Sequence, residues 1–403
     1  MKDSSRLAII GAAALPVGWF PDQLGMDAAV LALRKAISDA GIDKKEIGAI
    51  YVSPPLADEW LEYHLSFARL VDEFGLGLHN KFTGQIQAGG AGIKSMFGAA
   101  RGVILTEEPK NIILLHTQSV SGIPKRLPPE AIEDFARDGS RQYIEWEYPY
   151  GMNSDSRVAL VTQRYMHETG TTAEQLASVA VSHHKWAQMN PFARFGNSVT
   201  IKDVLNSDVV AEPLHDLECS KLSDTATALV LTSAERAKSM GKRPVYVLGE
   251  GSGRCTHFSI VQKPDKDLSR LPGLSEAVES ALKEAGVKRE DIDVIEAHGG
   301  YPVFTLMELE EMGFCKRGSA GAFVMDGNTS PGGKLPMCTN GDSLAEGHAG
   351  FGTGFRTLYE SVLQLRGDAG KRQVQGAKLV LSVFAETEAF MQFDVAILGK
   401  DLV

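Results

Sequence analysis

The sequence predicts an α/β protein made of two duplicated halves, and three observations lead to this prediction. The first is a pair of 22-residue segments, 32–53 and 277–298, that align without gaps at an offset of 245. The second is a glycine-rich turn in each half, followed both times by a helical stretch and a strand. The third is the alternation of predicted strands and helices, which is typical of layered α/β folds with largely buried sheets.

The two aligned segments each predict an amphipathic helix that ends at a glycine, a short charged turn and a strand. A predicted buried strand at Leu7–Ala13 comes before the first of them. The matched positions are Ala36 and Ala281, Ala40 and Ala285, Gly41 and Gly286, Ile42 and Val287, Ile47 and Ile292, and Ile50 and Ile295. Matched spacing over the whole segment favours duplication over chance similarity between two helix–strand units.

The glycine-rich turn of the first half, 88–92, precedes a predicted helix at 93–104 and a strand at 111–117. In the second half the turn at 347–354 precedes a predicted helix at 355–365. The strand KLVLSVF then follows a basic turn. Each half therefore repeats the order strand, helix, strand, glycine-rich turn, helix, strand.

We expect the N-terminal half to comprise residues 1–240 and the C-terminal half 241–403. The region 128–202 does not fit the repeat, and we interpret it as an insertion in the first half. It holds the aromatic run 143–150 and a predicted helix with two adjacent histidines, His183 and His184. Such an insertion either covers a substrate pocket or forms a plain surface subdomain, and the sequence leaves both open.

The composition is that of an ordinary globular chain of 403 residues, with 43% hydrophobic and 23% charged residues. It excludes a disordered chain, a collagen-like chain and a coiled coil. The formal net charge of −10 disfavours nucleic-acid binding, which needs a basic face. Four cysteines without a CxxC pair do not make a disulfide scaffold, so we expect a reducing, cytoplasmic setting. The uncharged run Leu7–Pro21 is too short for a membrane span.

The two glycine-rich turns are candidate anion sites, because a helix start offers unpaired backbone N–H groups and glycine lets a ligand approach them. The candidate binding glycines are Gly89, Gly90, Gly92 and Gly347. The alternative is that these turns serve only the close packing of helix on sheet. Equivalent turns in a duplicated fold favour the functional interpretation, since pseudo-symmetry can bring both to one site.

His348 and His298 are the strongest polar candidates, since each lies at an end of a predicted core element in the second half. A histidine beside a helix start tends to stay neutral and act as a base or donor. The alternative for each is a structural histidine. No HExxH, P-loop or GxSxG motif is present, and we expect no metal site. Cys338, in the polar loop before His348, is either a nucleophile or a small buried apolar residue.

At these residues the sequence resembles the thiolase superfamily, over nearly the whole chain. The resembling stretches include RLAIIGAA, NPFA, DIDVIEAHGGY and LPMCTNGDSLAEGH. The resemblance is to the branch typified by the thiolase domain of sterol carrier protein X and by bacterial lipid-transfer-protein-like thiolases. It implies a five-layer αβαβα fold of two similar halves, usually assembled as a homodimer.

The sequence departs from that family at the catalytic cysteines. The nucleophile position of the first glycine-rich turn is best matched by Gly89, and no shift of register supplies a thiol. Glu386 stands where the loop with the second cysteine begins. His348 is kept, but the following family proline is Ala349, and the family aspartate after His298 is Gly299. A cysteine acyl-enzyme is therefore not expected.

We predict an enzyme of acyl-CoA thioesters that breaks or forms C–C bonds through a thioester enolate, as an aldolase or a non-thiolytic acyltransferase. His348 and His298 would hold the thioester oxygen or move protons, Gly89 and Gly90 would donate backbone hydrogen bonds, and Glu386 would be a base. Family members without the cysteines act as aldolases on steroid side chains, often with an OB-fold, zinc-ribbon partner protein. In them tyrosines transfer protons, and Tyr301 is near the site by sequence. Coenzyme A enters as part of the substrate, with no tightly bound cofactor.

The alternative function is that of a catalytically degenerate thiolase, which binds acyl-CoA or lipid or scaffolds a complex. The missing cysteines, Ala349 and Gly299 favour it. A third possibility keeps acyl transfer and moves the nucleophile to Cys338. Turnover of an acyl-CoA separates the enzyme from the binding protein, and selective labelling of Cys338 tests the third.

Overall fold

The computed structural model describes residues 6–23, 25–53, 70–72, 74–76, 82–86, 91–106, 111–122, 150, 152–240, 243–255, 268–385 and 392–402. The first half contains β1 (Leu7–Ala14), α1 (Gly25–Ala40), β2 (Ile47–Ser53), β3 (Phe82–Gln85), α3 (Gly92–Thr106), β4 (Asn111–Gln118) and β7 (Thr225–Ser233). Between β4 and β7 lie α6 (Ser154–Thr169), α7 (Ala173–Ala187), α8 (Ile201–Leu205), β5 (Val209–Ala211) and β6 (Leu214–His215).

Helix α9 (Ala234–Ser239) leads to the second half. This half contains β8 (Val245–Arg254), α10 (Pro272–Ala285), β9 (Val294–Glu296), α11 (Pro302–Glu311), α12 (Ala320–Met325), α13 (Thr353–Arg366), β10 (Leu379–Ala385) and β11 (Gln392–Gly399). Among these described helices, none is long and apolar enough to cross a bilayer.

The strand order shows the duplication directly. The sheet runs β3-β2-β4-β7-β1-β8-β11-β10-β9. Counted outward from the β1–β8 junction, the strands β1, β7, β4 and β2 of the first half match β8, β11, β10 and β9 of the second. In the first half β2 and β4 are parallel, and β7 is antiparallel to both β4 and β1. In the second half β9 and β10 are parallel, and β11 is antiparallel to both β10 and β8. The pairs Ala8–Tyr246 and Ile9–Val245 join the two parts.

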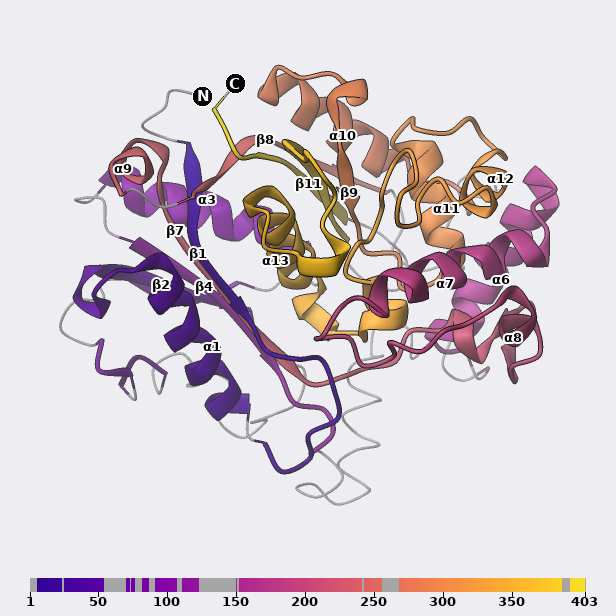
Figure 1. The fold of residues 1–403 in the computed structure, drawn as a ribbon, viewed down its shortest axis with the longest axis horizontal. Coiled ribbons are helices and arrows are strands. Elements are labelled where there is room, and N and C mark those ends of the chain that lie inside the picture. Colours follow the sequence, from indigo (N-terminus) through magenta and orange to yellow (C-terminus); the bar gives the residue numbers. More distant parts are fainter. Residues whose placement is uncertain are drawn as a thin grey trace.

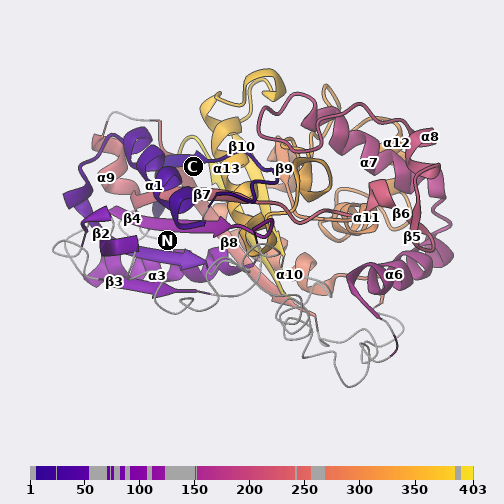
Figure 2. The same cartoon turned by 90° about the horizontal axis from the view of Figure 1, so that it is seen from below.

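Helices cover the outer face of each half of the sheet, and other helices lie between the two halves. This arrangement gives the five layers of the αβαβα fold. Side chains on β1 alternate between faces, as a pleated strand requires. Leu7 and Ile9 pack in one core with Phe97 of α3 and Phe355 of α13. Their neighbour Ala8 packs in a second core with α1 and α10. Figure 2 shows α1 and α3 on opposite faces of the strands of the first half.

The outer helices approach the first strand of their half equally closely. A Cβ atom at Gly11 of β1 would lie 2.4 Å from the carbonyl oxygen of Ala36, and one at Gly249 of β8 would lie 2.3 Å from that of Ala281. Only glycine allows a helix backbone this near a strand. Because Ala36 and Ala281 are partners in the sequence repeat, the predicted duplication is confirmed in three dimensions.

The helices α6, α7, α8, α11 and α12 form a separate group beside the sheet (Figure 1). Helices α6 and α7 belong to the predicted insertion at 128–202, whose part 128–149 lies outside the described residues, as does most of the aromatic run 143–150. Helix α7 contacts α11 and α12 of the second half. Because α11 begins directly after the loop that carries His298, this helical group lies next to that loop.

Candidate active site

A cavity of about 250 Å³ lies where the helical group meets the second half. It is lined by Ser154, Asp155, Val158, Ser220, Leu222, His298, Gly299, Gly300, Tyr301 and His348. We call it the histidine cavity. The inserted helix α6, the segment 220–222, the loop after β9 and the turn before α13 all contribute to it. The structure thus brings the two predicted histidines together from distant parts of the chain.

His298 is almost fully buried, and its Nδ1 faces protein rather than the cavity. Nδ1 lies 3.0 Å from the hydroxyl oxygen of Ser343 and 3.5 Å from Oδ1 of Asp342. The Ser343 hydroxyl can donate or accept, whereas an ionised carboxylate only accepts, so we assign the proton of a neutral His298 to Nδ1. Nε2 then carries the free lone pair. The ring centre lies 5.3 Å from that of His348.

His348 has the opposite arrangement. Its Nδ1 accepts a hydrogen bond of 3.1 Å from the backbone N–H of Gly350. Burial, and then the neighbouring His298, lower the pKa of His348 to about 3, against a smaller opposing effect of Asp342. The ring is therefore neutral near pH 7, and its single proton is on Nε2. One histidine of the pair thus offers an acceptor and the other a donor.

Asp342 is the charged partner of this pair. Its Oδ2 accepts a hydrogen bond of 2.9 Å from the N–H of Gly300 and lies 3.8 Å from Nδ1 of His183. Burial raises the pKa of Asp342, but the contact with His298, the charge of His183 and the Gly300 N–H outweigh it and lower the pKa to about 2. Asp342 also has a positive φ of 50°, in the region that non-glycine residues avoid.

Tyr301 spans the cavity toward the inserted helix. Its hydroxyl donates a hydrogen bond of 2.8 Å to Oδ1 of Asp155, in the first turn of α6. Tyr301 is itself the N-cap residue of α11, which continues with Pro302 at its first position. Two helices therefore begin at the cavity, and this hydrogen bond connects them.

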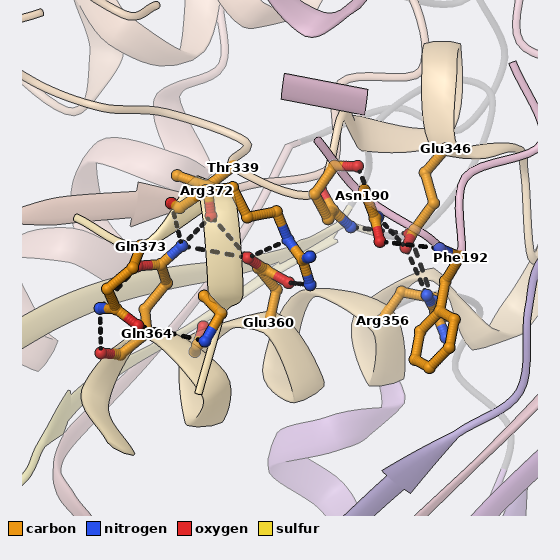
Figure 3. A network of polar contacts seen from close by, with 12 residues as sticks. Asn190, Phe192, Thr339, Glu346, Arg356, Glu360, Gln364, Arg372 and Gln373 are labelled. Atoms are coloured by element: carbon orange, nitrogen blue, oxygen red, sulfur yellow. Dashed lines mark hydrogen bonds and ion pairs between the residues drawn. The ribbon is translucent and has the colours of Figure 1, made fainter. Parts of the chain in front are cut away.

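A buried polar network holds the turn that carries His348 (Figure 3). Glu346, two residues before His348, forms an ion pair with Arg356 of α13. Its carboxylate also accepts hydrogen bonds from the side chains of Asn190 (3.0 Å) and Asn340 (2.8 Å). A buried charge needs such partners, and together they fix the direction of the turn.

A second network holds the strand that leads to His298. The hydroxyl group of Thr339 lies within hydrogen-bond distance of two carboxylates, that of Glu296, two residues before His298, and that of Glu360 of α13. Glu360 pairs with Arg372 at 2.8 Å (Figure 3). Burial and the nearby Glu360 raise the pKa of Glu296 well above its usual range. Both histidines therefore follow a glutamate that is anchored in the core.

The predicted binding glycines have different outcomes. Gly347 (φ 112°) packs closely, because a Cβ there would lie 2.7 Å from Val17 and 2.8 Å from the Ser223 hydroxyl, and it is not among the residues that line the cavity. Gly92 is the buried first residue of α3. Gly89, Gly90 and Glu386 lie outside the described residues.

No disulfide joins the four cysteines, and none of them lines the histidine cavity. Cys338 is completely buried, and burial and the nearby carboxylates raise the pKa of its thiol well above the usual value. Its Sγ donates a hydrogen bond to the carbonyl oxygen of Ala297. Burial raises the pKa of Cys219 to about 12 and that of Cys315 to about 11. These surroundings disfavour a thiolate. Among the described residues no His, Cys, Asp or Glu cluster is suited to a metal ion.

Sequence reasoning missed the acidic groups of the site and Ser343. Asp155 lies two residues after Asn153, a typical N-cap residue that forms a capping box with Ser156. The start of a helix was therefore recognisable there. Asp342 follows Gly341 in the stretch before His348, but nothing in its spacing connects it with His298. His183 stands out in the sequence only as one of two adjacent histidines, and the structure places it behind Asp342.

Comparison with known proteins decides the family. A family model described as thiolase C-terminal domain-like matches residues 252–400. The chain is 31% identical to an acetyl-CoA acetyltransferase of Methanothermobacter thermautotrophicus, over 93% of this chain and 94% of that protein. The chain belongs to the thiolase superfamily. The resemblance and the five-layer fold inferred from the sequence are thereby confirmed.

Two further relatives of this thiolase-superfamily protein carry the name of aldolase. A steroid side-chain-cleaving aldolase of Thermomonospora curvata is 30% identical over 83% of this chain and 84% of that one. A solved structure titled Ltp2-ChsH2(DUF35) aldolase matches with a TM-score of 0.82 and 26% identity, over 98% of both chains. The family of this chain therefore includes both acyl transfer and C–C cleavage.

Proposed function

We propose that this protein breaks or forms a C–C bond of an acyl-CoA thioester through an enolate, without a cysteine acyl-enzyme. The observation that carries the proposal is the pair His298 and His348 at one cavity, one with a free lone pair on Nε2 and the other with a proton there. Enolate chemistry needs both a base and a hydrogen-bond donor for the oxyanion.

In the cleavage direction, the substrate is a 3-hydroxyacyl-CoA. Nε2 of His298 takes the proton of the hydroxyl group, the oxygen forms a carbonyl, and the bond between the α and β carbons breaks. Its electron pair passes into the thioester enolate, whose oxygen accepts a hydrogen bond from Nε2–H of His348. The imidazolium of His298 then returns the proton to the α carbon. The products are a shortened acyl-CoA and an aldehyde or ketone, with no free CoA consumed.

The surroundings of the cysteines support this route over thiolysis. A thiolytic enzyme must present a thiolate to the substrate, and burial raises the pKa of Cys338 and of Cys219. The aldolase names of the Thermomonospora protein and of the solved Ltp2-ChsH2(DUF35) structure give independent support.

Coenzyme A enters this scheme as part of the substrate, and we propose no tightly bound cofactor. The solved aldolase is named as a pair of proteins, which supports a partner of the OB-fold, zinc-ribbon type for this chain as well. We also propose a homodimer and a location in the cytoplasm. Sedimentation of the purified protein, alone and with a co-expressed partner, tests the assembly.

A non-catalytic role in acyl-CoA or lipid binding is the second candidate. The missing cysteine nucleophile and Gly299, in place of the aspartate that the resemblance implies after His298, favour it. This role predicts retention of acyl-CoA by the protein without any product.

The test is a mass-spectrometric assay with a panel of 3-hydroxyacyl- and 3-ketoacyl-CoAs, with and without the co-expressed partner. A shortened acyl-CoA plus an aldehyde or ketone, formed without free CoA, is the expected result. His298→Ala and His348→Ala should each slow its formation by about a hundredfold or more, while His167→Ala, at an exposed histidine on α6, serves as the matched control. Cleavage that requires free CoA would contradict the proposal, and retention of intact substrate would favour the binding role.

A further inference from the structure

We infer that Asp342 is a positioning residue, which holds His298 with its proton on Nδ1 and its Nε2 free to act as the base. The role of Asp342 in catalysis rests on the proposed function, whereas its role in orienting His298 does not. It assigns a role in the reaction to a residue that touches no substrate.

The carboxylate of Asp342 contacts the His298 segment at two places. Oδ1 lies 3.5 Å from Nδ1 of His298, and Oδ2 accepts a hydrogen bond of 2.9 Å from the backbone N–H of Gly300. The ring and the backbone two residues later are thus tied to one side chain. With Ser343 Oγ at 3.0 Å from Nδ1, the imidazole has little freedom to turn.

The backbone at Asp342 supports a function beyond packing. Its φ of 50° lies in the left-handed region, and it directly follows Gly341 with a φ of 104°. A non-glycine residue in this region costs free energy and persists where the surroundings enforce it. The strained backbone brings the carboxylate to His298 from a segment far along the chain, where the resemblance implies an aspartate directly after that histidine and the sequence has Gly299.

The other titratable groups around His298 leave Asp342 as its counter-charge. Glu308 of α11 is completely buried and has no hydrogen-bond partner for either carboxylate oxygen within the described part of the chain. Burial, and then the charge of Asp342, raise the pKa of Glu308 well above its usual value, which disfavours its ionised form. His183 of α7 lies behind Asp342, and its pKa, like that of His348, is lowered by burial. Cys338 is a neutral thiol, since burial raises its pKa.

During the proposed reaction His298 becomes an imidazolium. An ionised carboxylate beside Nδ1 stabilises this cation and preserves the tautomer that exposes Nε2, as an aspartate does behind a catalytic histidine in a triad. Removal of the carboxylate should therefore lower kcat rather than raise KM.

The experiment combines histidine NMR with kinetics on the full chain. In the wild-type protein, ¹⁵N shifts should show a neutral His298 protonated on Nδ1. In Asp342→Asn these ¹⁵N shifts should change, because the carboxylate that accepts the Nδ1 proton is lost. In the same variant kcat should fall by about 10²–10⁴-fold with KM nearly unchanged, and the acidic limb of the pH profile should move to lower pH.

Glu308→Gln is the matched control, because it alters a buried carboxyl group of the same region and should leave the tautomer of His298 and the kcat of the wild type. Asp342→Glu should restore part of the kcat. A wild-type His298 protonated on Nε2 would overturn the inference even if no variant folds, and so would unchanged ¹⁵N shifts of His298 in Asp342→Asn. If the NMR results are as expected but no acyl-CoA is turned over, the proposed function fails and the positioning of His298 by Asp342 stands.

Discussion

Strands β2 and β9 occupy equivalent places in the two halves, yet they end in different surroundings. Strand β2 ends at Ser53, and β9 leads into His298 at the matching position of the repeat. The helices before them end alike, at Gly41 (φ 65°) and Gly286 (φ 72°). The repeat thus preserves the residues that let helices pack on strands, while the polar residues of the described site come from the second half and from the segment between β4 and β7.

This difference indicates that the scaffold and the chemistry obey separate constraints. Close packing fixes glycine and alanine at the same positions twice, because each outer helix must approach its strand equally closely. A catalytic group is needed only once, and the described neighbours that it requires come from the second half and from the segment between β4 and β7. Four experiments test or sharpen this comparison.

The largest effect is expected at the histidine pair. His348→Ala removes the donor for the enolate oxygen and should lower kcat by about 10²–10³-fold. His348→Gln, which keeps an N–H group, should recover part of this loss, whereas His298→Gln should not recover the function of a base. Steady-state kinetics on the best acyl-CoA of the panel measure both. Equal losses in the two glutamine variants would contradict the division into donor and base.

His116, which lies near the end of β4 in the first half, should affect stability and not catalysis. It is completely buried, its Nε2 lies 3.2 Å from the carbonyl oxygen of Ala349, and burial lowers its pKa to about 4. Because the unfolded chain takes up this proton near pH 6.5, folding stability is lost as the pH falls from about 6.5 to 4. The loss from His116 is about 3 kcal/mol. Urea unfolding at pH 7 and pH 5 should show a smaller pH dependence in His116→Gln, and an unchanged slope would count against it.

The paired glycines should respond alike. Gly11→Ala and Gly249→Ala each place a Cβ within 2.4 Å of a helix carbonyl oxygen, so the free energy of unfolding should fall by about 1–3 kcal/mol in both. Gly98→Ala on α3 is the control. Its Cβ meets nothing within 4 Å, and the change should stabilise the helix by about 0.5–1 kcal/mol. Thermal unfolding measures the stability of all three variants. If one of the two paired substitutions left the stability unchanged, the two positions would not be equivalent.

The smallest effect is expected at the link between the inserted helix and the second half. Tyr301→Phe removes the hydrogen bond to Asp155, which contributes about 1 kcal/mol. Turnover should fall by about fivefold. A loss as large as that of His348→Ala would instead show that Tyr301 transfers a proton itself.

The repeat, the helix ends and the two histidines were predictable because their signals are local. A helix that is followed by a glycine, and a strand that is followed closely by a histidine, can each be recognised within a few residues. Asp342 and Asp155 were not predictable, since each meets its partner only through the tertiary fold. The missing side chain of Gly347 makes room for Val17 and Ser223, and its anion-binding role stays a prediction.

The central layer of the molecule makes the two halves depend on each other. Helix α3 of the first half contacts β11 of the second, and α13 of the second half contacts β1 and β7 of the first. Either half alone would expose the apolar faces that these helices cover in the other. The duplicated chain therefore gains cooperativity, since both copies must melt together, and the hydrogen bonds that orient His298 and His348 persist for as long as the whole molecule is folded.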